Sequence, residues 1–215
     1  MTRILCGLLL AAAIFAQTPI SVPQADETLA KGRKNGLFAL LTTSMGAITI
    51  QLLEKDSPLT VASFVGLSMG TKPWRDPATK QVKQTPLYNG TIFHRVIPQF
   101  MIQGGDPTGT GSGSPGFVVP DEWTRSSLTF NIPGRVAMAN AGPNTTGCQF
   151  FITTDPATFL DGKHTIFGNV VDGMKVVQKI VAVPRNANDK PKTPVVIESV
   201  QIFRVGPEPQ VKVKK

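Results

Sequence analysis

The sequence is poor in cysteine, histidine and tyrosine, and each shortage removes a class of function or of covalent support. Among 215 residues there are two cysteines, two histidines and one tyrosine. Cys6 lies in an apolar leader that we expect to be removed, so Cys148 alone would remain and no intrachain disulfide could form. The folded domain must therefore be held together by its hydrophobic core.

The two histidines and the remaining cysteine do not form a metal-binding pattern. The intervals between His94, Cys148 and His164 match no common ligand spacing. A catalytic thiol at Cys148, with either histidine as its base, is as strongly disfavoured as a metal site. We therefore expect neither a metal nor a cofactor.

The chain has no apolar run long enough to be kept as a membrane-spanning helix. Residues 4–16 (ILCGLLLAAAIFA) follow a start that carries Arg3 and end in small residues, which is typical of a secretory signal peptide. We expect cleavage after Ala16, or at a site no later than residue 25. The mature protein would then be periplasmic or secreted, without stable membrane insertion. An uncleaved anchor and a start codon assigned too early are the alternatives.

A concentrated basic patch is also missing, although the formal net charge is +8. The basic residues are scattered over four segments, at 31–34, 72–83, 185–192 and 212–215. They lack the interleaved aromatic residues of single-strand nucleic acid binders. We interpret them as solvated surface that favours acidic partners by electrostatic steering, and we expect no nucleic acid partner.

Short strand-forming segments dominate the rest of the chain. We expect residues 17–36 to be a linker, residues 37–205 to form one domain and residues 206–215 to be a disordered tail. Apolar runs rich in strand formers occur at 37–43, 47–53, 93–106, 117–119, 128–132, 135–139, 149–153, 165–170 and 195–204.

Two segments have the apolar spacing of helices. Residues 58–69 have Pro58 in the first turn and Gly70 as a stop, and residues 172–182 form a shorter pattern. Many short strands with only two helices predict a mainly β fold, an antiparallel β-barrel closed so that no edge is exposed, with the helices over its ends.

Two irregular segments interrupt the strands. Residues 71–87 are basic and contain three prolines, so we expect a surface loop. Trp74 is expected to anchor this loop to the barrel, and an exposed recognition role is the alternative. Residues 104–116 (GGDPTGTGSGSPG) are rich in glycine but lack the Gly-Lys-Ser/Thr ending of a phosphate-binding loop, so we expect a long turn.

Residues 93–106 (FHRVIPQFMIQGGD) combine strand-forming residues with polar ones that a purely structural strand would not need. Pro98 lacks an amide donor, so the strand should bend there or lie at an edge. Arg95, Met101 and Gln103 share parity, and they would share one face if the bend preserves register. A cation, an amide and apolar surface on one face suit a peptide groove better than a core.

Three motifs, FHRVIPQFMIQGGD at 93–106, RVAMANAGPNTTGCQFFIT at 135–153 and FLDGKHTIFGNVVDGM at 159–174, occur in this order. Together they resemble the cyclophilins, a family of peptidyl-prolyl cis-trans isomerases. The resemblance covers about residues 37–205. It implies a closed eight-stranded antiparallel β-barrel capped by two α-helices, with the active groove on its outer face.

Matched to these motifs, Arg95 resembles the catalytic arginine of the family and His94 its neighbour in the groove. Five residues match the pocket for the substrate proline ring, namely Phe100, Met101, Phe151, Leu160 and His164. Five others match contacts to the flanking peptide: the polar Gln103 and Gln149, and the segment of Ala139, Asn140 and Ala141. Phe159, also placed at the substrate site, stands where many members have tryptophan, so the resemblance implies weak cyclosporin binding.

The chemistry of this reaction fits the residues present. Rotation about a peptide bond that precedes proline neither makes nor breaks a bond to carbon, so it needs no nucleophile and no metal. Arg95 stays charged and can donate a hydrogen bond to the proline nitrogen of the twisted amide. We predict a monomeric isomerase that acts on proline-containing unfolded or flexible polypeptides and assists folding outside the cytoplasm. The alternative is a non-catalytic binding module or chaperone that uses the same groove.

Overall fold

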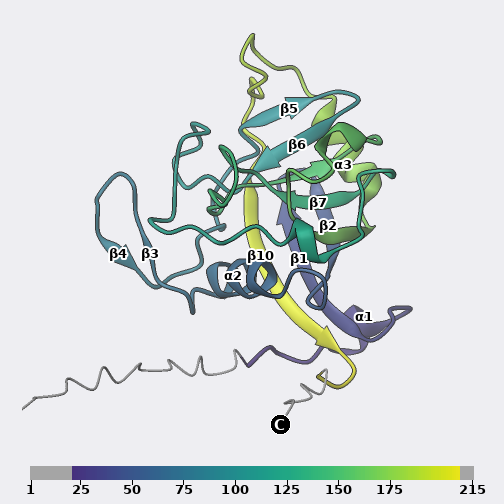
Figure 1. Cartoon of the computed structure of the whole chain (residues 1–215). Helices are drawn as coiled ribbons and strands as arrows, with labels where there is room; N and C mark the ends of the chain where they lie inside the picture. Colours follow the sequence, from purple (N-terminus) through teal and green to yellow (C-terminus); the bar gives the residue numbers. More distant parts are fainter. Residues whose placement is uncertain (1–20, 209–215) are drawn as a thin grey trace, which may run out of the picture.

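Residues 21–208 are described by the computed structural model, shown as a ribbon in Figure 1. The expected signal peptide, the first residues of the expected linker and residues 209–215 of the expected tail lie outside the described residues. Within residues 21–208, no helix combines the length and apolar character needed to cross a membrane.

Eight antiparallel strands form one curled sheet in the order β10-β1-β2-β9-β7-β8-β6-β5. The bounds are β1 (Gly36–Thr43), β2 (Gly46–Leu52), β5 (Arg95–Ile97), β6 (Met101–Gly104), β7 (Arg135–Met138), β8 (Phe150–Thr153), β9 (Ile166–Asp172) and β10 (Ile197–Val205). The prediction of a mainly β, eight-stranded antiparallel sheet is confirmed.

The prediction of a closed barrel is wrong, because the outer strands β5 and β10 do not pair with each other. They approach at one end, where Ile92 and Val196 form an isolated bridge and the amide of Ile197, the first residue of β10, donates to the carbonyl of Thr91 (2.8 Å). Strand β5 is short, and the amide of Val96 at its centre donates to the carbonyl of Asp189, 2.8 Å away, in the loop before β10. That amide is therefore used by a loop instead of a strand, and the sheet is a curled half-barrel.

Both expected helices form, as α2 (Pro58–Met69) and α3 (Met174–Val181). Helix α2 ends at Gly70, whose φ of 72° is left-handed, as expected for a helix stop. At its other end no side chain of the helix provides a cap. Instead the buried carboxylate of Glu122 accepts hydrogen bonds from the amides of Leu59 (3.0 Å) and Thr60 (2.8 Å).

The expected count of two helices is wrong, because a third helix, α1 (Glu27–Ala30), lies in the segment expected to be a linker. Close to it, the chain runs beside β10. The amide of Ala25 donates to the carbonyl of Arg204 (2.8 Å), and the amide of Arg204 donates to the carbonyl of Pro23 (2.9 Å). Strand β10 is an outer strand with unpaired backbone groups, so it can bind this segment although the segment has no strand-like pattern.

The irregular segment at 71–87 contains a small separate hairpin made of β3 (Trp74–Arg75) and β4 (Val82–Lys83). The hairpin projects from the main body on the left of Figure 1. The expectation that Trp74 anchors the segment is confirmed. Its side chain is buried in the main core, and its Nε1 donates to the carbonyl of Thr85 at 2.9 Å.

The predicted strands at 117–119 and 128–132 do not form. Val119 makes only an isolated bridge to Thr146, and a short 3-10 helix, η1 (Trp123–Arg125), lies between the two segments. Short apolar runs are compatible with several backbone states, and prolines at 120 and 133 limit ladder pairing here.

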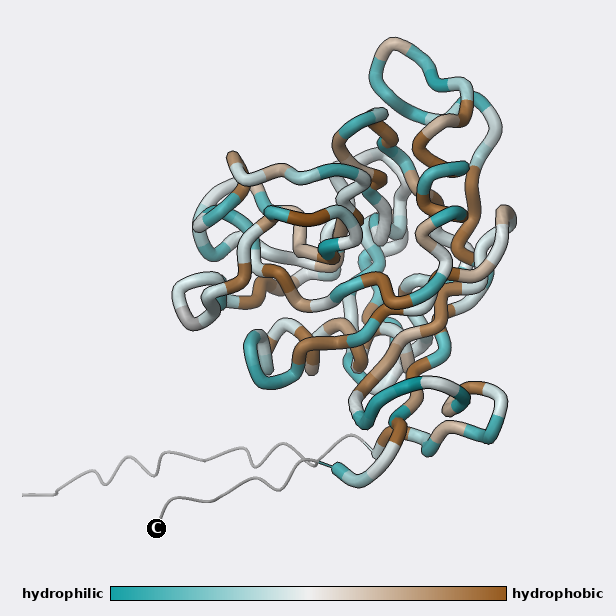
Figure 2. Tube along the Cα trace, turned by 90° about the vertical axis from the view of Figure 1, so that its right-hand side faces the viewer, coloured by the Kyte–Doolittle hydropathy of each residue, from teal (hydrophilic) through white to brown (hydrophobic). Residues whose placement is uncertain are grey.

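The sheet separates two apolar clusters, because successive strand residues point to opposite faces. The larger cluster is the main core, where residues such as Ile102 and Ile152 pack under α2 and α3. The smaller cluster contains Met101 and Phe151, their neighbours along the same strands. Figure 2 shows hydrophobic segments along the strands and helices and hydrophilic ones in the peripheral loops. Because Met101 and Phe151 point to the opposite face from Ile102 and Ile152, the smaller cluster is not part of the half-barrel interior.

Candidate active site

Strands β5 and β6 form a tight hairpin that places the predicted catalytic arginine opposite a predicted polar contact. Arg95 pairs directly with Gln103, and Ile97 pairs with Met101. The turn between the strands has Pro98 at its second position and Gln99, with a φ of 61°, at its third, as in type II turns. The bend therefore preserves register, and the predicted shared face is confirmed.

A row of directly paired residues continues across the sheet from this hairpin. Gln103 pairs with Phe151 on β8, and Phe151 pairs with Ala137 on β7. Directly paired residues point to the same face, so Arg95, Gln103 and Phe151 form a cation–amide–aromatic row. The side chain of Arg95 is 46% exposed, whereas Phe151 is 5% exposed. The surface thus changes from charged to apolar within three neighbouring strands.

Four of the five residues matched to the proline pocket belong to the smaller apolar cluster. Met101, Phe151 and Leu160 are its buried members at this point, and Phe100 and Ala139 pack against it while partly exposed. Leu160 comes from the second 3-10 helix, η2 (Thr158–Leu160). These side chains meet on the outer face of the sheet, and Met101 (2%), Phe151 (5%) and Leu160 (9%) are largely covered by their neighbours.

His164 closes one side of this cluster. Its ring stands edge-on to Phe151, with centroids 5.3 Å apart, and its Nδ1 lies 3.0 Å from the carbonyl oxygen of Met138. A carbonyl only accepts, so Nδ1 carries the proton and Nε2 is the acceptor in the neutral ring. Burial lowers the pKa of His164, which favours this neutral form.

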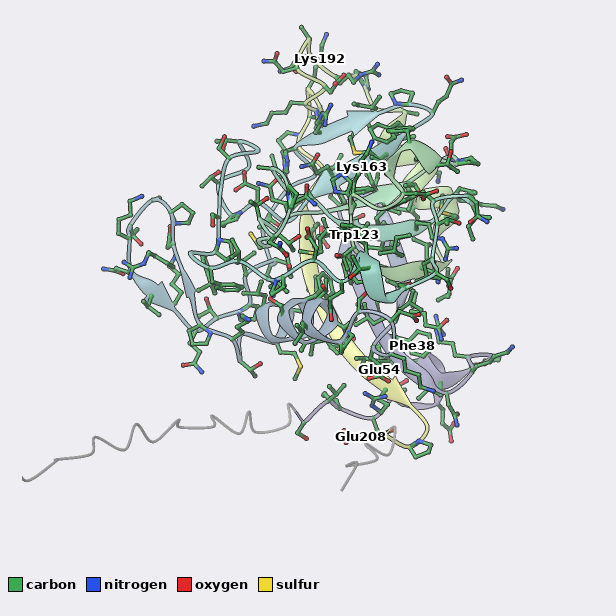
Figure 3. All side chains as sticks on the ribbon, in the orientation of Figure 1. Phe38, Glu54, Trp123, Lys163, Lys192 and Glu208 are labelled. Carbon is green, nitrogen blue, oxygen red and sulfur yellow. The ribbon has the colours of Figure 1, made fainter. Side chains whose placement is uncertain are left out.

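Phe159 lies at the open edge of the cluster. It is 62% exposed, and its ring is tilted against that of Phe100 with centroids 5.3 Å apart. Lys163, labelled in Figure 3, holds the neighbouring backbone: its Nζ donates to the carbonyl of Phe159 (3.0 Å), and its own carbonyl accepts from Nδ2 of Asn140 (2.8 Å). These two hydrogen bonds connect Asn140, in the predicted peptide-binding segment, through Lys163 to Phe159 at the edge of the apolar cluster.

The predicted polar contacts gather around a hollow next to this cluster. The Nε2 of Gln103 donates to Oε1 of Gln149 (3.0 Å), and the Nε2 of Gln149 donates to the carbonyls of Gly111 (3.0 Å) and Gly113 (3.1 Å). The hollow measures about 280 Å³, and residues 139–141 form part of its wall. All five predicted contacts to the flanking peptide therefore line one polar hollow.

Asp106, which the sequence analysis did not single out, organises the glycine-rich segment on the rim of this hollow. Its fully buried carboxylate accepts hydrogen bonds from the amides of Thr108 (2.7 Å), Thr110 (3.2 Å), Gly111 (2.6 Å) and Gly113 (3.0 Å), and from the Thr108 hydroxyl (2.8 Å). Burial raises the pKa of Asp106, but these hydrogen bonds outweigh it and the net pKa is lowered. The amides that could have cradled a phosphate are thus directed at Asp106.

His94 is placed differently from Arg95. It is 6% exposed, and neither ring nitrogen has a hydrogen-bond partner among the described residues. Gly111 lies against it, since a Cβ there would be 3.6 Å from Cδ2 of His94. Burial lowers the pKa of His94, and Asp106 acts in the opposite direction. Of the two neighbours, Arg95 presents its polar group at the surface and His94 lies inside.

Cys148, the one cysteine among residues 21–208, is inaccessible. Cys148 is 1% exposed, and burial raises the pKa of its thiol to about 12. A nucleophilic cysteine needs its thiolate form near neutral pH, so this environment does not suit a catalytic thiol. Among residues 21–208, no three histidine, cysteine or acidic side chains are grouped so that they could hold a metal ion.

Comparisons with known proteins agree with this arrangement. Residues 38–202 match the family described as cyclophilin type peptidyl-prolyl cis-trans isomerase/CLD. The chain is 50% identical over 169 residues to "Peptidyl-prolyl cis-trans isomerase B" of Streptomyces anulatus, covering 77% of this chain and 96% of that protein. It is 49% identical over 166 residues to "Peptidyl-prolyl cis-trans isomerase A" of Mycobacterium tuberculosis H37Rv, covering 76% and 91%.

Solved structures show the same similarity in three dimensions. A crystal structure of a cyclophilin type peptidyl-prolyl cis-trans isomerase from Cryptosporidium parvum superposes with a TM-score of 0.68 at 31% identity, covering 79% of this chain and 98% of that one. A structure of that protein in the presence of the dipeptide Ala-Pro gives 0.67 at 32% identity, covering 77% and 98%. The chain therefore belongs to the cyclophilin-type peptidyl-prolyl cis-trans isomerase family.

Proposed function

We propose that this isomerase accelerates rotation of X-Pro bonds in unfolded or flexible polypeptides outside the cytoplasm, with Arg95 as its catalytic residue. The observation that carries the proposal is the row of Arg95, Gln103 and Phe151 on one outer face of the sheet. This row offers a cation for the reacting nitrogen, an amide for the flanking peptide and an apolar surface for the proline ring.

The reaction has a barrier of about 18–20 kcal/mol because the amide must lose its resonance in the twisted state. Unaided, the rotation takes tens to hundreds of seconds. A catalyst lowers this barrier by binding the twisted amide more tightly than either planar form. Going from about 0.01 to about 1000 turnovers per second requires about 7 kcal/mol, at about 1.36 kcal/mol for each factor of ten.

Arg95 supplies the interaction that is specific to the twisted state. The proline nitrogen has no available lone pair in a planar amide and regains one when the bond is twisted. A guanidinium fixed beside it then gains a charge-assisted hydrogen bond that is poor in the ground state. The side chain is about half exposed and lies on the same face as the apolar cluster, so it can reach a bound peptide.

The rest of the site would keep one side of the bond still while the other turns. The ring would rest against Met101, Phe151 and Leu160, and residues 139–141 with Gln103 would hold the flanking chain. Immobilising the reacting groups in this way reduces the entropic part of the barrier.

We propose export because residues 4–16 form an apolar run that follows Arg3 and ends in small residues, as in a cleaved signal peptide. We also propose that the mature protein is a monomer. N-terminal sequencing of the protein purified from its source cells should begin between residues 17 and 26. A mature chain that still starts at Met1 would contradict export by cleavage.

The catalytic proposal is tested by a protease-coupled assay on an X-Pro peptide. Replacing Arg95 with alanine should lower kcat/KM about a hundredfold or more, the scale seen when a transition-state donor is removed. Arg75→Ala is a matched control, since it removes an arginine from the separate hairpin of β3 and β4. Near-equal rates for the parent and Arg95→Ala, with peptide binding retained, would favour a non-catalytic binding module.

A further inference from the structure

A tight loop, residues 184–192, reaches from α3 back over β5 before entering β10, at the top of Figure 1. Lys192, labelled in Figure 3, lies near its end. The loop is fixed internally, since the amide of Asn186 donates to the carbonyl of Lys190 (2.9 Å) and the amide of Asp189 donates to the carbonyl of Asn186 (3.1 Å). Asp189 has a φ of 60°, a left-handed state that aspartate tolerates better than most residues.

Asp189 contacts β5, the strand that carries Arg95, through both its backbone and its side chain. Its carbonyl accepts the 2.8 Å hydrogen bond from Val96, the residue after Arg95. Its Oδ2 lies 3.8 Å from Nε of Arg95, and its Oδ1 accepts a 3.1 Å hydrogen bond from Nε of Arg185. One carboxylate oxygen is thus bound to Arg185, and the other faces Arg95 at ion-pair distance.

We propose that Asp189 is a positioning residue for Arg95, which holds the guanidinium at the angle that the twisted amide requires. The inference rests on the proposed role of Arg95. The carboxylate approaches Nε, and no hydrogen bond joins the two terminal nitrogens of Arg95 to another described residue. Those nitrogens are left to donate to the substrate, while the inner nitrogen faces the carboxylate at ion-pair distance, 3.8 Å.

A partly exposed arginine needs such a partner. Its long side chain carries about 2 kcal/mol of rotamer entropy, and an unrestrained guanidinium would spend little time aimed at the reacting nitrogen. An ion pair at this exposure contributes little to the stability of the fold. Its effect should therefore appear in the rate, because misplacing a catalytic group by about 1 Å can cost about a hundredfold.

The same loop also joins the cation to the polar hollow. The Nζ of Lys190, next to Asp189, donates to the carbonyl of Gly109 at 2.9 Å. Gly109 belongs to the glycine-rich segment that Asp106 holds at the rim of the hollow. One loop thus contacts both Arg95 and the far rim of the site.

The kinetic test compares Asp189→Asn with Asp172→Asn. Asparagine accepts the left-handed backbone, keeps the carbonyl that binds Val96 and removes the charge. Asp172 is a matched control, an exposed aspartate on β9 that lies 3.9 Å from Arg33. We expect Asp189→Asn to lower kcat three- to tenfold with KM within twofold, and Asp172→Asn to match the parent. Asp189→Gly, which also accepts the backbone angle, should show the same loss.

A double-mutant cycle separates positioning from a merely structural role. In an Arg95→Ala background, Asp189→Asn should cause no further loss, because it acts through the absent guanidinium. An unchanged kcat in Asp189→Asn, or an equal loss with and without Arg95, would overturn the proposal.

A measurement that does not use activity keeps this inference distinct from the proposed function. The ¹⁵N order parameter of Arg95 Nε, measured by NMR relaxation, should fall in Asp189→Asn and stay at the parent value in Asp172→Asn. An unchanged order parameter would overturn the positioning role even if Arg95→Ala abolishes catalysis. A lower order parameter beside a fully active Arg95→Ala variant would show that Asp189 restrains Arg95 and that the proposed catalytic role fails.

Discussion

The carboxylate of Asp106 accepts a hydrogen bond from the amide of Gly113, and a Cβ on Gly113 would overlap that carboxylate. The two residues are therefore mutually dependent: the glycine leaves space for the acid, and the acid binds the glycine's amide. Because this segment forms the rim of the polar hollow, the pair connects a buried charge to the shape of the site.

Replacing Gly113 with alanine should destabilise the domain and reduce activity together. The added methyl group has no space unless Asp106 moves, and moving it would break hydrogen bonds worth about 1.5–3 kcal/mol each to a charged group. We expect a loss of about 2–4 kcal/mol in the free energy of unfolding, measured by urea denaturation. Gly90→Ala is the control, since nothing lies within 4 Å of a Cβ there and only its φ of 82° is strained. An equal loss in both variants would contradict the pairing.

The two histidines should make stability depend on pH between about pH 5 and pH 7.5. Burial lowers the pKa of both His94 and His164, so the unfolded chain binds protons at them at higher pH than the native state does. The free energy of unfolding should therefore rise with pH through about 6.5, the ordinary histidine pKa, and fall as the solution becomes more acidic.

His94→Gln should weaken this dependence, since glutamine does not titrate. Urea denaturation at pH 5.5 and 7.5 gives the difference for the parent and the variant. A parent that becomes more stable at pH 5.5, or a variant with an undiminished pH dependence, would contradict the effect of burial.

The thiol of Cys148 should be unreactive in the folded protein. Burial raises its pKa to about 12 and leaves 1% of the residue exposed, so both the thiolate and access to it are lacking. In the mature chain, a thiol-reactive disulfide reagent at pH 8 should react slowly without denaturant and rapidly in concentrated urea. Equal rates in the two conditions would show that Cys148 is accessible in the native state.

Cyclosporin should inhibit weakly because phenylalanine stands at position 159. Phe159→Trp would enlarge the exposed ring beside Phe100 and add an N–H donor, and we expect inhibition to tighten about tenfold, or about 1.4 kcal/mol. Val118→Trp, at another exposed apolar position, should leave inhibition unchanged. Inhibition titrations on the three proteins check this, and tight inhibition of the parent would refute it.

Residue spacing predicted one part of the candidate site, and the other site residues were predicted from the resemblance of three motifs to the cyclophilins. The period-2 parity of Arg95, Met101 and Gln103 predicted a shared face, and their cross-strand pairing confirms it. Spacing did not indicate Asp106 or Asp189, because an aspartate in a glycine-rich or polar loop looks the same whether it is solvated or buried. Contacts between loops distant in sequence, which leave no local pattern, give these two residues their importance.

Helix α2 and strands β1 and β2 lie close to where the local patterns placed them, since capping, proline placement and apolar alternation act over a few residues. Local patterns failed where partners lie far apart in the chain. They could not show that the Val96 amide binds the 184–192 loop and leaves the sheet open, that His94 lies inside while Arg95 is exposed, or that residues 23–25 run along β10. Those outcomes depend on which distant backbone groups compete for the same hydrogen bond, and this competition is settled only when the whole chain has folded.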